Sequence, residues 1–190
     1  MPGAAVLRRE QACIGAPPGR ITLAEPAWDA GRNELVSGGD VLTQNHVYTS
    51  VWRIRLDGQA RRVLLAHTVG SKSPAGVQLD GLSALAVDAQ GRIHIASRVM
   101  PTDHQNRARG SGEIGVMRVD EAQGSVLAVT GAKLPAWGHD QTLALDGPAE
   151  RATFKKMQGM CFAPEGTLYV LDEFTVRRID RQGPVSTWVY

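Results

Sequence analysis

Apolar and polar residues alternate in short segments along most of this chain. In residues 51–57, VWRIRLD, Ile54 and Leu56 fall on one side of an extended strand. Arg53 and Arg55 fall on the other side, which we expect to be the outer face that meets solvent. Similar segments recur along the sequence, separated by polar turns that contain glycine. A period of two residues predicts β-strands rather than amphipathic helices.

The predicted strands fall into three similar units. Each unit opens with a short apolar strand, a polar turn and an alternating strand, as in PAWDAGRNELVS (26–37), LAVDAQGRIHIAS (85–97) and CFAPEGTLYVLD (161–172). We expect the turn glycines to supply the positive φ of tight hairpins; they are Gly31, Gly91 and Gly166.

A second hairpin follows in each unit, at residues 51–67, 115–129 and 175–189. We expect an aspartate in each of these turns to accept hydrogen bonds from nearby backbone amides; the three are Asp57, Asp120 and Asp180. Four antiparallel strands in each of three units is the organisation of β-propeller blades.

The fold class is therefore all-β, a partial β-propeller of about three four-stranded antiparallel blades. That is half of a six-bladed propeller. We expect an N-terminal segment, 1–20, and one propeller-type domain, 21–190. Its blades should span approximately 21–67, 81–130 and 155–190.

Composition agrees with this interpretation. Gly (21) and Pro (10) are plentiful, which suits many short strands and turns. The sequence has no apolar run long enough for a transmembrane helix or a signal peptide, which predicts a cytoplasmic protein without membrane contact. Cys13 and Cys161 lie far apart, which favours buried thiols over a metal site; a disulfide between them stays open.

Residues 146–190 resemble an NHL repeat, whose pattern includes an acidic-Gly start, DxxGxLYVxD and RIRxID. The matching positions include Asp146, Gly147, Phe154, Gly159, Gly166, Leu168, Tyr169, Val170, Asp172, Arg177, Ile179, Asp180 and Val185. Together with looser matches in the first two units, the resemblance covers residues 21–190. It implies a propeller that works as a binding or scaffold module.

The first unit, AEPAWDAGRNELVSG (24–38), is also similar to the start of SMP-30/gluconolactonase-like propellers. That resemblance implies a metal-dependent hydrolase with Glu25 as a ligand of a divalent ion such as Ca²⁺, which takes oxygen ligands. Asp80, Gln158 or Asp172 would complete such a site near the axis. The family has Asn before Gly where this chain has Gln158 before Gly159.

Polar side chains concentrate in the connections that a propeller places on one face. These connections are the insertions 38–46 and 98–113 and the links 67–80 and 131–145. Because binding residues often lie on loops, we expect this looped face to hold a small molecule, glycan or protein. Its candidate residues are His46, His67, Asp103, His104, Arg107, Trp137, His139 and Asp140. The alternative is that these loops are polar because they meet water.

Two further patterns have structural interpretations. His94 lies between Ile93 and Ile95 on the opposite side of a strand, which favours a hydrogen-bonded strand histidine over a ligand. Some NHL propellers bind RNA through a basic face, for which the candidates are Arg107, Arg109, Lys155, Lys156, Arg177 and Arg178. The net charge of +2 and an aromatic content of 5% disfavour nucleic acid as a partner.

Three blades leave two blade faces open, and open apolar faces promote association. We expect a homo-oligomer in which two chains join head to tail in a six-bladed ring. The alternatives are the remaining blades of a longer propeller chain and a partial propeller whose segment 1–20 covers one open side. The leading function is a binding module. The alternatives are the metal-dependent hydrolase and a purely structural, self-assembling half-propeller.

Overall fold

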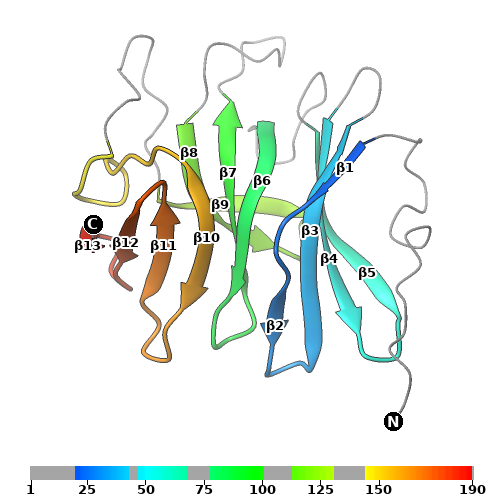
Figure 1. The fold of residues 1–190 in the computed structure, drawn as a ribbon. Helices are drawn as coiled ribbons and strands as arrows, with labels where there is room; N and C mark the ends of the chain where they lie inside the picture. The colour runs from blue at the N-terminus through cyan, green and yellow to red at the C-terminus, as the bar shows by residue number, and fades with distance from the viewer. Residues whose placement is uncertain (1–19, 43–46, 68–77, 101–112, 131–143, 190) are drawn as a thin grey trace.

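The computed structural model describes residues 20–42, 47–67, 78–100, 113–130 and 144–189. These residues form strands and turns, and the fold is all-β (Figure 1). Three antiparallel sheets stand side by side as about three blades of a partial β-propeller, as the sequence predicts. The described part of the chain contains no helix of the length and hydrophobicity that a bilayer span requires.

The first blade has five strands instead of the expected four, because its inner position is divided. Both β1 and β2 pair with β3, and Pro26, which has no N–H to donate, lies between them. The sheet then continues outward through β4 to β5. The strands are β1 (Arg20–Leu23), β2 (Ala27–Asp29), β3 (Glu34–Leu42), β4 (Val47–Arg55) and β5 (Ala60–His67).

The second and third blades each have four strands in chain order from the inner to the outer edge. The second contains β6 (Gln78–Val87), β7 (Ile93–Met100), β8 (Glu113–Asp120) and β9 (Ser125–Thr130). The third contains β10 (Met157–Phe162), β11 (Leu168–Asp172), β12 (Thr175–Ile179) and β13 (Val185–Val189). In Figure 1 the β2–β3, β6–β7 and β10–β11 turns all lie at the lower edge.

The turn glycines follow the sequence expectation in two blades out of three. Gly91 and Gly166 have φ values of 74° and 89°, in the left-handed region that favours glycine. Gly31 does not adopt a positive φ. In that turn Asn33 does, at 55°, and asparagine tolerates this conformation better than most residues.

The aspartates of the second hairpins stabilise their turns in two different ways. The carboxylates of Asp57 and Asp120 accept hydrogen bonds from backbone N–H groups two residues later, at 3.0 and 3.1 Å. The carboxylate of Asp180 accepts no backbone N–H among the described residues and pairs with Arg178 at 2.7 Å, as Asp57 also pairs with Arg55 at 3.1 Å.

Part of each predicted insertion belongs to a strand. Residues 38–42 continue β3 and residues 98–100 continue β7, so both hairpins are longer than the sequence suggests. Asp40 therefore lies in a strand and not in a loop. Its carboxylate accepts hydrogen bonds from Thr49 at 2.6 Å and from the N–H of Leu82, in the second blade, at 2.9 Å.

The second blade is buried on both of its faces. Its larger apolar residues, including Leu85, Ile93 and Ile95, join a core cluster with the first blade. Small residues of β6 and β7, including Ala84 and Ala96, join a separate cluster with the third blade, together with Val116 of β8. In β6 and β7 the strand period of two therefore places large side chains at one interface and alanines at the other.

Arg177 holds the segment before β10 against the third blade. The sequence had made this residue a candidate for a basic face. It is fully buried, and its guanidinium pairs with Asp146 at 2.8 Å and with Asp172 at 3.3 Å. It also lies 5.2 Å from the ring centroid of Phe154. Four positions of the NHL-like pattern are thus one structural cluster.

Cys161, expected to be buried, is instead exposed with a free thiol.

Candidate functional site

Most residues proposed for the looped face lie outside the described part of the chain. These are His46, Asp103, His104, Arg107, Trp137, His139 and Asp140. His67 is the last residue of β5, and its side chain also lies outside the description. Binding at the looped face therefore stays a prediction.

The residues proposed for a central metal do not converge among those described. Glu25 is exposed between β1 and β2. Both oxygens of Asp172 have partners, because one accepts from the N–H groups of Lys155 and Lys156 and the other pairs with Arg177. In residues 20–42, 47–67, 78–100, 113–130 and 144–189, no three His, Cys, Asp or Glu side chains form a group that could hold a metal ion.

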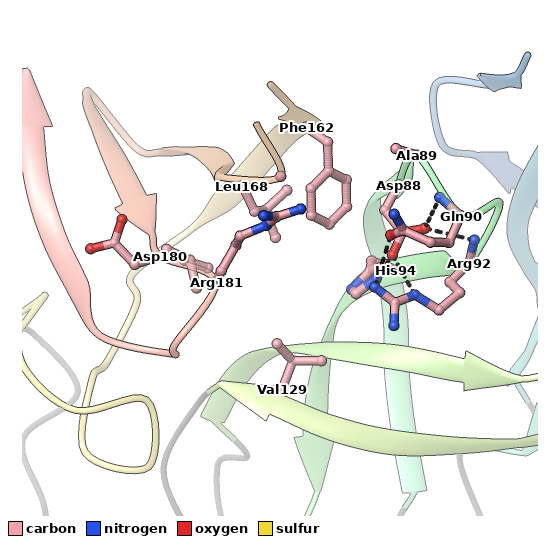
Figure 2. Close-up of a pocket in the computed structure, with 12 residues that line it drawn as sticks. Asp88, Ala89, Gln90, Arg92, His94, Val129, Phe162, Leu168, Asp180 and Arg181 are labelled. Carbon is pink, nitrogen blue, oxygen red and sulfur yellow. Dashed lines mark hydrogen bonds and ion pairs between the residues drawn. The ribbon is translucent and has the colours of Figure 1, made fainter. Parts of the chain in front are cut away.

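A groove of about 230 Å³ lies between the second and third blades, at the edge that carries the tight turns. Figure 2 shows its two walls. Asp88, Arg92 and His94 of the second blade form one wall. The other carries Phe162 and, from the β12–β13 turn, Arg181. The groove is smaller than the roughly 300–1,000 Å³ sites of drug-sized ligands, so a ligand held there would be small.

His94 and Asp88 are buried polar residues of this groove, each with only 7% of its surface exposed. The Nε2 of His94 lies 3.2 Å from Asp88 Oδ2, while its Nδ1 has no hydrogen-bond partner among the described residues. The ring packs edge-on against Phe162, with centroids 4.8 Å apart. Burial lowers the pKa of His94, and the positive charges of Arg92 and Arg118 lower it further against the opposing effect of Asp88. The neutral imidazole is therefore favoured.

Asp88 orients this wall. Its carboxylate accepts hydrogen bonds from the N–H groups of Gln90 and Arg92, at 3.0 and 2.9 Å, and pairs with Arg92 Nε at 2.6 Å. Burial alone would raise the pKa of Asp88. The hydrogen bonds from Arg92 and His94 outweigh burial, so the pKa of Asp88 lies below its ordinary value.

Two guanidinium groups have no acidic partner among the described residues: that of Arg181, which lines the groove, and that of Arg118, which does not line it but lies beside His94. Arg118 is opposite His94 in the β7–β8 pairing, so both side chains lie on the same face of the sheet. Arg181 extends from its turn toward Phe162 (Figure 2). A Cβ atom at position 166 would lie 2.5 Å from Arg181 Nε, so only glycine lets the guanidinium approach this closely.

The corresponding positions between the first and second blades form a closed ion cluster. Arg53, expected on a solvent-facing side, is fully buried there. Its guanidinium pairs with Asp29 at 2.7 Å, with Glu121 of the second blade at 2.7 Å and with Glu34 at 3.5 Å. It also donates to the carbonyl of Gly91. Each charge of this cluster thus has an opposite charge beside it.

The strand pairings define which residues correspond in the two interfaces. One row of paired residues crosses the first blade: Ala27, Val36, Arg53 and Arg61. The matching row of the second blade is Ala86, His94, Arg118 and Leu127. His94 thus replaces a valine, and Arg118 takes the place of Arg53.

The sequence correctly placed His94 opposite Ile93 and Ile95, but it did not identify the groove. His94 is a strand histidine that is hydrogen-bonded through Nε2, as expected, but its Nδ1 has no partner among the described residues. Pairing the two predicted strands that became β7 and β8 could have placed His94 and Arg118 opposite each other, in one row. The third blade's contribution, Arg181, follows only from the packing of one blade on the next.

No known protein family matches this sequence, and a search of curated proteins finds no significant match. Several solved structures resemble this one, and two of them illustrate how weak the likeness is. A protein of unknown function from Bacteroides thetaiotaomicron is 17% identical, with a TM-score of 0.40 over 85% of this chain and 46% of that one. A gluconolactonase from Xanthomonas campestris is 14% identical, with a TM-score of 0.30 over 90% of this chain and 79% of that one.

This chain thus spans less than half the length of the Bacteroides protein. Both TM-scores are low, so neither likeness supports a statement about function. The class of protein is defined by the chain's own sheets, which are those of a partial β-propeller.

Proposed function

We propose that this chain is a propeller-type binding module that takes a small molecule in the groove between its second and third blades. The observation that carries the proposal is the buried imidazole nitrogen of His94, which has no partner and belongs to a residue lining the groove. Buried polar atoms are nearly always hydrogen-bonded, and exceptions often mark functional positions. Binding sites also combine apolar walls with a few polar groups, as Phe162, Leu168 and His94 do here.

A matched pair of tryptophan variants tests this proposal. Ala89 is exposed and lines the groove, so Ala89→Trp should block it without disturbing the core. Ala30 follows Asp29 in the first blade as Ala89 follows Asp88, and it is also exposed, so Ala30→Trp is the control. The probes are inorganic phosphate, benzoate, benzamide, glucose and N-acetylglucosamine at millimolar concentration. The readouts are the melting temperature and the imidazole ¹⁵N resonances of His94.

We expect at least one probe to raise the melting temperature and shift the His94 resonances in the wild type and in Ala30→Trp, but not in Ala89→Trp. The proposal fails if no probe moves these resonances, or if the blocked variant responds like the wild type. The metal-dependent hydrolase has no comparable support, because its candidate ligand Glu25 is exposed.

The open face of the third blade favours self-association as a second role. Tyr169 and Trp188 lie on the side away from the second blade, with ring centroids 5.0 Å apart, and 59% of Trp188 is exposed. Leu171 is on the same side and is 42% exposed. On the open side of the first blade, Trp52 packs under Arg62. Aromatic residues of this kind are enriched at protein interfaces.

We propose that a second copy of the chain, arranged head to tail, covers these two faces. Light scattering should then give a mass twice the 20.4 kDa of one chain, and Trp188→Ser should restore the single-chain mass. Phe174→Ser is the control, because Phe174 is 84% exposed but lies in the turn between β11 and β12. A wild-type protein with the mass of one chain at all concentrations would rule out this assembly.

A further inference from the structure

We propose that the ligand of the groove is a small organic anion, whose oxyanion group binds between Arg181 and Arg118 and whose apolar part packs on Phe162 and Leu168. This inference rests on the proposed function and names its ligand class. It follows from the charges that the two blade interfaces place at corresponding positions.

Two acidic positions of the first interface are arginines in the second. Glu34 precedes the row residue Val36 by two positions, and Arg92 precedes His94 by two. Glu121 follows Asp120 at the β8–β9 turn, and Arg181 follows Asp180 at the β12–β13 turn. The arginine of the row is kept, as Arg53 in the first blade and Arg118 in the second.

These replacements leave positive charge without compensation beside the groove. Asp88, which corresponds to Asp29 of the first interface, already pairs with Arg92 and His94. Asp180 also lines the groove, and its carboxylate pairs with Arg178 at 2.7 Å. Within the described residues, the guanidinium groups of Arg118 and Arg181 therefore remain for an anion.

The surroundings of Arg181 suit an anion better than a neutral ligand. Gly166 lets the guanidinium lie directly against the backbone of the β10–β11 turn. A guanidinium presents a planar pair of N–H donors that matches the two oxygens of a carboxylate or phosphate. Arg181 itself is exposed, and Phe162, Leu168 and Ile179 form an apolar wall nearby on which the rest of such a ligand could pack.

His94 supplies a readout that is independent of affinity. The charged groups facing it are Asp88, Arg92 and Arg118 on its own blade, with Asp180 and Arg181 on the opposite wall. An anion beside the ring stabilises the imidazolium form, so occupancy should raise the pKa of His94. By linkage, the anion should bind more tightly as the pH falls toward that pKa.

Benzoate and benzamide test the inference, because they have nearly the same shape and differ in charge. Calorimetric titration at low salt should give a dissociation constant for benzoate at least about tenfold lower than that for benzamide. Arg181→Gln and Arg118→Gln should each weaken benzoate about tenfold or more, while Arg62→Gln, on the open side of the first blade, should leave it unchanged. NMR titration should show that benzoate raises the pKa of His94.

The outcomes either reject the anion inference alone or reject both proposals. If benzamide binds in the groove as tightly as benzoate, or if Arg181→Gln keeps its affinity, the groove is a binding site but the anion inference is wrong. If neither compound, nor inorganic phosphate, nor either sugar shifts the His94 resonances, both proposals fail. If benzoate binds equally well to Ala89→Trp, the anion occupies another surface, and both proposals fail for this groove.

Discussion

The interface between the first and second blades and the interface between the second and third blades use the same strand positions for different ends. In the first, Arg53 has Asp29, Glu34 and Glu121 around it, and the charges close the interface. In the second, arginines replace two of these acids and a groove remains. A propeller scaffold can therefore seal or open the space between blades by changing a few charges at its turn edge.

The largest expected difference between the interfaces concerns their two corresponding arginines. Arg53→Met leaves the buried Asp29 without its cation and should lower the free energy of unfolding by about 3–5 kcal/mol. Arg118→Met removes a cation that has no acidic partner among the described residues, so its effect should stay below about 1 kcal/mol. Urea denaturation of both variants measures the difference. Equal effects would mean that the two interfaces are not distinct in the way described.

Two turn glycines should differ by a smaller amount. Gly91→Ala and Gly166→Ala both force alanine into a left-handed conformation, which costs about 1–2 kcal/mol. At Gly91 the new Cβ would also lie 2.9 Å from Asp29 Oδ2, which is fixed by Arg53. At Gly166 it would meet the end of Arg181, which can move. Thermal unfolding should show Gly91→Ala as the less stable variant. The reverse order would contradict the closed ion cluster described for the first interface.

The smallest expected effect is a pH dependence that only the second interface has. Because burial lowers the pKa of His94, the unfolded chain takes up a proton at higher pH than the folded chain does. Stability should therefore be fully present above the unfolded pKa of about 6.5 and decline as the pH falls below it, by at most about 1.4 kcal/mol per pH unit.

His94→Val, which copies Val36 of the first blade, should remove this contribution. The difference in unfolding free energy between wild type and variant, measured from pH 7.5 to 5.5, isolates it from other histidines. Asp88 and Glu121 act at lower pH, because their pKa values lie below the ordinary carboxylate range and their contribution is lost only as the pH falls through the acid range. An unchanged difference across the range would show that His94 is not a buried neutral base.

The sequence predicted the three blades because period-two alternation and turn glycines are local signals. It predicted that Arg53 and Ile54 lie on opposite sides of β4, but it assigned the wrong side to solvent. In a propeller both faces of a blade can be buried, so alternation separates two faces without showing which one meets a neighbour. The partners of Arg53 are 24 and 68 residues away, at Asp29 and Glu121, and no local pattern connects them.

The candidate site was less predictable for the same reason. His94 and Arg118 belong to one blade, and their shared row follows from strand pairing. Arg181 joins them only because the third blade packs against the second. The asparagine in the first turn gives a milder example, because Asn33 adopts the positive φ that was expected of Gly31, and the glycine spacing does not encode this detail of the turn.

The second blade contributes to two core clusters that have no residue in common. The first and third blades are therefore coupled mainly through the sheet between them, as neighbouring units are in repeat proteins. Hydrogen exchange should be slowest in β6 and β7, which lie within both clusters, and damage to that central sheet should uncouple the two ends. The groove then lies at one of the two blade interfaces on which cooperative folding of the chain depends.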